Sequence, residues 1–152
     1  MSSIRQILFD GVLSGLAAGT VMGLISHAAF RLGIFKSSLF IIDGSFTLKS
    51  LGMKHSEIHS VMLGIPVHLL TSISFGLSYG LLAYLLHTYP TDIWILTFYV
   101  FLLWLSMLFV ALPVAGQGVL GRRLGPTTWF EQLILHGVFG IVLWSTLYLL
   151  HQ

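Results

Sequence analysis

The sequence predicts an all-α integral membrane protein: a four-helix bundle with an interfacial segment between helices 1 and 2. Of its 152 residues, 56% are hydrophobic and only 8% are charged, whereas a soluble domain carries about 25% charged residues. Four apolar stretches are long enough to cross a bilayer, which takes about 20 residues. The basic residues cluster in two of the connections. We therefore expect residues 1–152 to form a single transmembrane domain.

The first predicted span, about Ile7–Leu32, is rich in glycine. Its glycines recur at every fourth position and so share one helix face. In lipid, small residues hold helices together because they let two backbones approach closely. The second span also has two glycines four residues apart. The helix that packs against these glycines belongs to this chain or to a different subunit. The glycines expected to pack in this way are Gly11, Gly15, Gly19, Gly23, Gly76 and Gly80.

The longest connection, residues 33–59, is not simply polar. Its apolar stretches Leu39–Ile42 and Phe46–Leu51 are too short to span, and Asp43 and Gly44 separate them. An interfacial or re-entrant segment in the headgroup region is expected here.

The remaining spans follow in order. Pro90 and Asp92 predict a turn and then a helix N-cap. Thr127 or Thr128 is expected to cap the last helix, with Glu131 as its capping-box partner. These three spans are predicted at about Ser60–Leu86, Ile93–Ala115 and Thr128–Leu150.

Basic residues orient the predicted bundle. Only Arg5 lies on the side of the termini. The positive-inside rule therefore places both termini outside and loops 33–59 and 116–127 in the cytoplasm. The six basic residues on the opposite side are Arg31, Lys36, Lys49, Lys54, Arg122 and Arg123.

Three histidines fall inside predicted spans. At 1.5 Å per residue, His68 and His136 lie roughly 12 Å from the cytoplasmic ends of their spans, and His27 about 8 Å. Each has a glycine one turn away, which leaves clearance beside the imidazole. Two imidazoles at one depth suit axial ligation of a b-type haem or a chlorin. The alternative is interhelical hydrogen bonding to nearby Ser, Thr and Gln side chains, a common device in membrane bundles.

A second histidine pair lies in the first connection. His55 and His59 are four residues apart, share a helix face, and are candidate ligands for zinc or iron. Membrane desaturases and hydroxylases use several such boxes with adjacent His-His pairs, which this sequence lacks. A solvated interfacial stretch explains His55 and His59 without a metal.

Composition and motifs leave little room for catalysis. The absence of cysteine excludes disulfides, thiolate metal sites and cysteine nucleophiles. The sequence has no nucleophile-elbow motif and no phosphate-binding loop, and no Asp is expected at mid-membrane. We therefore expect no enzyme, and a transporter or channel ranks last.

Several short motifs resemble a small four-helix bacterial membrane-protein family of unknown function. The resemblance covers most of the chain and implies four helices, but it implies no activity. The motifs are the glycine-rich first span, Gly64-x-x-x-His68, Phe75-Gly76-x-x-Tyr79-Gly80, Pro113-x-x-Gly116-x-Gly118-x-x-Gly121, and His136-x-x-Phe139-Gly140 in the last span.

The histidines are the only residues in the sequence whose arrangement suggests a chemical role. We expect a non-enzymatic accessory or anchoring subunit of a larger bacterial energy-transducing, electron-transfer complex. Its partners would be the lipid bilayer and other membrane subunits, and nucleic acid is not expected. The alternative is a small b-type cytochrome with bis-histidine haem ligation by His68 and His136, with His27 as a substitute ligand.

Overall fold

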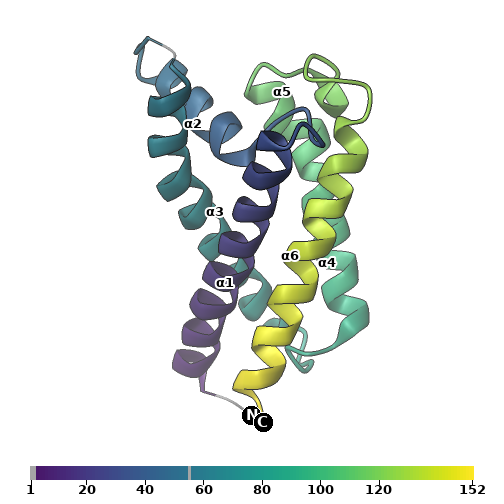
Figure 1. Ribbon diagram of the computed structural model, residues 1–152. Coiled ribbons are helices and arrows are strands. Elements are labelled where there is room, and N and C mark those ends of the chain that lie inside the picture. Colours follow the sequence, from purple (N-terminus) through teal and green to yellow (C-terminus); the bar gives the residue numbers. More distant parts are fainter. Residues whose placement is uncertain (1–2, 55) are drawn as a thin grey trace.

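The computed structural model describes residues 3–54 and 56–152, and the prediction of an all-helical four-helix bundle is confirmed (Figure 1). Each of the four long apolar helices begins and ends within three residues of its predicted span. The start of α1 and the end of α6 lie at one end of the bundle, which we call the terminal end (Figure 1). The opposite end, where α1 ends and α6 begins, is the basic end. The long helices are α1 (Ile4–Arg31), α3 (Glu57–Leu85), the third span (Ile93–Val114) and α6 (Thr128–Leu150).

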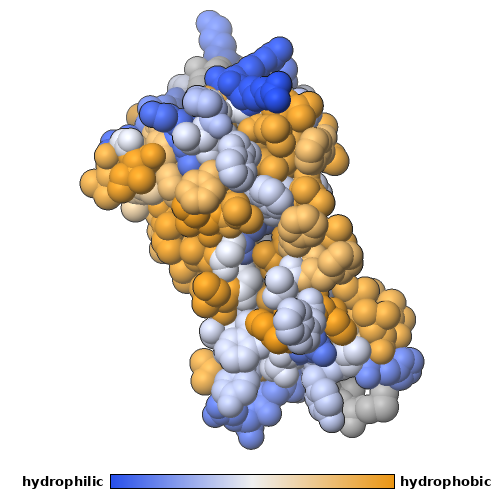
Figure 2. Space-filling view, turned by 90° about the vertical axis from the view of Figure 1, so that its right-hand side faces the viewer, coloured by the Kyte–Doolittle hydropathy of each residue, from blue (hydrophilic) through white to orange (hydrophobic). Residues whose placement is uncertain are grey.

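The surface fits a membrane protein. Figure 2 shows a broad hydrophobic surface over the middle of the molecule, between more hydrophilic ends. Many large apolar side chains of all four spans are exposed, among them Leu24, Leu70, Phe109 and Ile141. Such side chains suit contact with lipid, where they need no protein cover.

Polar side chains begin three of the helices. The hydroxyls of Ser3 and Ser56 accept backbone N–H groups at the starts of α1 and α3. The carboxylate of Asp92 accepts the N–H groups of Trp94 and Ile95, so its predicted N-cap is confirmed.

The capping box predicted for α6 is wrong. Thr127 makes no capping bond to the backbone, and its hydroxyl donates instead to Glu131 Oε1 at 2.8 Å. Glu131 Oε2 accepts the backbone N–H of Lys36 at 3.0 Å. Glu131 is buried, so it ties the loop after α1 to the start of α6, which a purely local motif does not predict.

The third span is not one regular helix. It runs from α4 (Ile93–Ser106) through a π-helical turn, η1 (Met107–Ala111), into the short α5 (Leu112–Val114). Pro113 has no N–H, and its ring crowds the carbonyl four residues earlier, so the wider π turn relieves that clash. The short 3-10 turn η2 (Val119–Gly121) follows before α6. π turns occur frequently at functional sites.

The glycine ladder packs inside this chain. A Cβ at Gly11 would lie 2.9 Å from the carbonyl oxygen of Gly76, and one at Gly15 would lie 2.5 Å from that of Ser72. Gly19 faces the Ser72 side chain. Helices α1 and α3 therefore meet backbone to backbone. At the two ends of the ladder, Gly23 faces Phe40 and Gly80 faces Ile7.

The connection after α1 folds back into the bundle. Helix α2 (Leu39–Ser50) begins with the Leu39 N–H bonded to Ser26 Oγ at 3.0 Å, inside the end of α1. The connection thus holds a short helix packed against the bundle, and the expected break at Asp43 and Gly44 is wrong. Gly44 lies against the Ser60 carbonyl of α3, so the missing side chain serves close packing within one continuous helix.

The order of packing leaves one side of the bundle open. Helix α1 packs between α3 and α6, α4 packs mainly against α6, and α2 packs on α3 at the basic end. Helices α3 and α4 meet chiefly through Tyr99, whose hydroxyl donates to the Phe75 carbonyl at 2.8 Å. Between this contact and the basic end, the side chains of all the long helices converge on a cavity.

Candidate functional site

A carboxylate and an imidazole pair in the interior of the bundle. Asp43 Oδ2 of α2 lies 3.1 Å from His68 Nδ1 of α3, and the other ring nitrogen of His68 lies 3.1 Å from the Gly19 carbonyl oxygen of α1. The His68 side chain is 8% exposed and that of Asp43 is 27% exposed. One imidazole thereby joins three helices.

The partners of His68 decide how many protons the pair holds. A carbonyl and an ionised carboxylate both accept and never donate. Both bonds therefore form only when Asp43 and His68 hold two protons between them, as imidazolium with carboxylate or as imidazole with a protonated carboxyl. Both forms have zero net charge, which lowers the cost of placing the pair in hydrocarbon.

Two glycines bring Asp43 to His68. Gly44 lies against the backbone of Ser60, and Gly64 lies against the backbone of Phe40, so α2 and α3 touch main chain to main chain. The Phe40 ring packs edge-on to His68, with centroids 5.5 Å apart. The position of the carboxylate thus depends on small residues rather than on a long side chain.

His136 offers its second nitrogen to the cavity. Its Nδ1 lies 2.8 Å from the backbone carbonyl of Gln132, one turn earlier in α6. Since that carbonyl only accepts, Nδ1 carries the proton, and Nε2 of the neutral ring is a bare acceptor. The main chain of Gln132 therefore sets the tautomer of His136.

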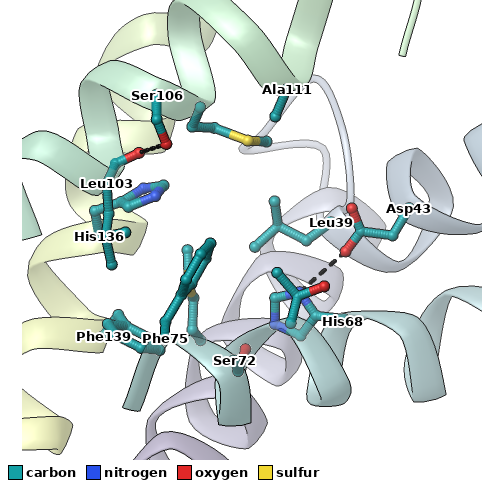
Figure 3. Close-up of a pocket in the computed structure, with 13 residues that line it drawn as sticks. Leu39, Asp43, His68, Ser72, Phe75, Leu103, Ser106, Ala111, His136 and Phe139 are labelled. Atoms are coloured by element: carbon teal, nitrogen blue, oxygen red, sulfur yellow. Dashed lines mark hydrogen bonds and ion pairs between the residues drawn. The ribbon is translucent and has the colours of Figure 1, made fainter. Parts of the chain in front are cut away.

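The cavity has a volume of about 110 Å³ and is lined by α1, α2, α3, the third span and α6. Figure 3 shows His136 on one side and the Asp43–His68 pair on the other, with Phe75 and Leu39 between them. Three exposed residues of α3 and the third span also line it: Thr71, Ser106 and Ala111. The cavity therefore opens sideways between α3 and the third span, toward lipid.

His27 does not line this cavity. Its Nδ1 lies 3.0 Å from Ser38 Oγ, immediately before α2, and its ring packs beside Phe40 at 5.9 Å. The structure thus brings His68 and His136 to one cavity, whereas His27 lies in α1, beside the start of α2. The hydrogen bond from His27 to Ser38 helps hold the connection between these two helices.

The second predicted histidine pair is only partly described. His55 lies outside the described residues. His59 is exposed in the first turn of α3, with Nδ1 2.7 Å from Ser56 Oγ. In residues 3–54 and 56–152, no group of three or more His, Cys, Asp or Glu side chains is placed to hold a metal ion.

The residues do not fit bis-histidine haem or chlorin ligation. Each axial histidine must offer one free ring nitrogen, and both nitrogens of His68 are hydrogen-bonded. The cavity of about 110 Å³ is also well below the roughly 300–1,000 Å³ of pockets for larger organic ligands. Of His68 and His136, only His136 keeps a ring nitrogen without a hydrogen-bond partner.

Sequence reasoning missed Asp43 and expected no carboxylate in the interior. Asp43 stands within an otherwise apolar stretch, next to Gly44. An acidic residue in such a stretch is itself a functional signal, and an adjacent glycine signals close approach of another backbone. Those two signals mark α2 as a packed element that carries a candidate site residue.

No protein-family model matches the chain, and none of the curated proteins or solved structures compared with it matches either.

Proposed function

We propose that the protein is a non-enzymatic accessory or anchoring subunit of an energy-transducing electron-transfer complex in the bacterial inner membrane. The observation that supports this proposal is the hydrogen-bonded Asp43–His68 pair beside a cavity inside the bundle. Ionisable groups in hydrocarbon are costly and mark places where proteins handle protons, ions or polar ligands.

The third span supplies a surface for a partner subunit. Within α4, only Leu96 and Val100 are buried. Trp94, Phe98 and Phe101 are exposed on the same helix. Aromatic side chains are enriched in the centres of protein interfaces, so this face suits another transmembrane helix. The glycine faces are already used within the chain and are not available for that purpose.

The charge distribution supports the orientation. Six of the seven basic residues lie in or beside the two connections at the basic end, and Arg5 alone is on the terminal side. In the proposed arrangement the basic end faces the cytoplasm. The Asp43–His68 pair then lies in the cytoplasmic half of the membrane.

Purification from native membranes tests the proposal. In a mild detergent, we expect the wild-type protein to recover partner subunits in fixed stoichiometry, with the absorption of redox cofactors carried by those partners. Replacing Phe98 and Phe101 by Ala should lower partner recovery about tenfold, because exposed aromatic residues at an interface carry much of its energy. Phe9→Ala is the matched control, since Phe9 on α1 is 57% exposed and Phe98 is 63% exposed.

Two outcomes count against the subunit proposal. One is a folded protein that recovers no stoichiometric partner in any mild detergent. The other is equal loss of partners in the Phe9 variant and in the α4 variants, which would trace the loss to general destabilisation.

A further inference from the structure

The cavity walls combine aromatic rings with hydrogen-bond acceptors. Phe75 and Phe139 line it, and aromatic side chains favour stacked or edge-on contact with another ring. Cavities of comparable size in protein cores hold a single benzene-sized ring. A ligand of this cavity is therefore a small flat head group rather than a large cofactor.

The polar groups of the cavity determine which hydrogen bonds the head group must donate. His136 Nε2 is a bare acceptor in the tautomer set by the Gln132 carbonyl. Across the cavity, Asp43 uses Oδ2 for His68 and has Oδ1 left as an acceptor. Two acceptors on opposite sides of one cavity suit a ring that carries an O–H at each end (Figure 3).

The opening of the cavity indicates what the rest of the ligand is like. It opens between α3 and the third span, where Thr71, Ser106 and Ala111 are exposed. This opening faces the bilayer, so the ligand enters from lipid and leaves any apolar tail there. The π turn Met107–Ala111 forms one edge of the opening.

We propose that this cavity is a binding site for a quinol: a membrane-soluble aromatic diol whose two hydroxyls donate to His136 Nε2 and to the Asp43 carboxylate. The aromatic walls hold the ring, and the tail passes out between α3 and the third span. The inference rests on the proposed function only for the choice of a redox carrier as the natural ligand. The oxidised quinone has two acceptor oxygens, which face acceptors here, so it binds more weakly.

Binding to the full chain in detergent micelles tests the site. 2-Decyl-1,4-hydroquinone and 2-decyl-1,4-benzoquinone are titrated separately by calorimetry at a fixed detergent concentration. We expect saturable binding of the quinol and at least tenfold weaker binding of the quinone. His136→Leu should weaken quinol binding about tenfold, the equivalent of one hydrogen bond.

A pair of neighbouring substitutions separates the site from general effects. Ala111→Trp fills the mouth and should abolish binding, whereas Val110→Trp places the same side chain at an exposed position outside the cavity lining and should leave binding unchanged. Absence of saturable quinol binding would overturn the inference. So would equal affinities for quinol and quinone, or equal effects of the two tryptophans. If the chain binds the quinol but recovers no partner subunit from native membranes, the proposed subunit role fails and the binding site stands.

Discussion

Gly64→Ala is expected to lower the free energy of unfolding by about 2–3 kcal/mol, near the upper end of the usual cost of overpacking. A Cβ at this position would collide with the backbone carbonyl of Phe40, which cannot turn aside as a flexible side chain does. The collision pushes α2 away from α3 and separates Asp43 from His68. Unfolding in mixed micelles of rising sodium dodecyl sulfate content, followed by circular dichroism, measures the effect.

Gly137→Ala is the matched control for this prediction. Gly137 lies in α6, and a Cβ there would meet nothing within 4 Å. Alanine also favours helix over glycine by about 1 kcal/mol, so this variant should be as stable as the wild type or more so. If Gly64→Ala and Gly137→Ala unfold alike, α2 does not pack on α3 as described.

Asp43→Ala is expected to cost about 2 kcal/mol of unfolding free energy. Breaking a fully buried ion pair in a soluble protein costs about 3–5 kcal/mol, because the remaining partner loses its compensation. Hydrogen bonds between membrane helices average only about 0.6 kcal/mol. The Asp43 side chain is 27% exposed, which places this pair between the two limits. The same mixed-micelle titration measures the loss.

Two further variants separate loss of the pair from loss of one partner. Asp43→Asn keeps an acceptor oxygen for His68 and should cost less than Asp43→Ala. The double variant Asp43→Leu with His68→Leu removes both polar groups and should recover most of the stability. The single variants Asp43→Leu and His68→Leu complete the comparison. If the double variant loses as much unfolding free energy as the two single variants together, the two residues do not interact.

Hydropathy predicts the spans well, because length and apolar content alone decide what crosses a bilayer. The N-cap at Asp92 is equally local and is confirmed. The four-residue glycine repeat predicts a packing face, but its partner depends on tertiary structure. The structure assigns that partner to α3, since Gly11 and Gly15 meet the backbones of Gly76 and Ser72.

The site is less predictable than the spans because its residues come from distant parts of the chain. The depth estimate for His68 and His136 agrees with their meeting at one cavity. Asp43 escaped prediction because Asp-Gly is a common turn signal, and here close contact with Ser60 keeps the helix continuous. Glu131 escaped because its partner, the Lys36 N–H, lies 95 residues away.

The hydrogen bonds of His68 require that Asp43 and His68 hold two protons between them inside the membrane. Magnetic resonance of the protein with isotope-labelled histidine in lipid nanodiscs observes the protons on each imidazole directly. We expect a hydrogen bond at both ring nitrogens of His68, with one proton on Nε2 and the other between Nδ1 and Asp43 Oδ2, and we expect the Nδ1 signal to shift in Asp43→Asn. His136 should show a proton at Nδ1 alone. A His68 ring with a nitrogen that makes no hydrogen bond, unchanged by Asp43→Asn, would contradict this expectation.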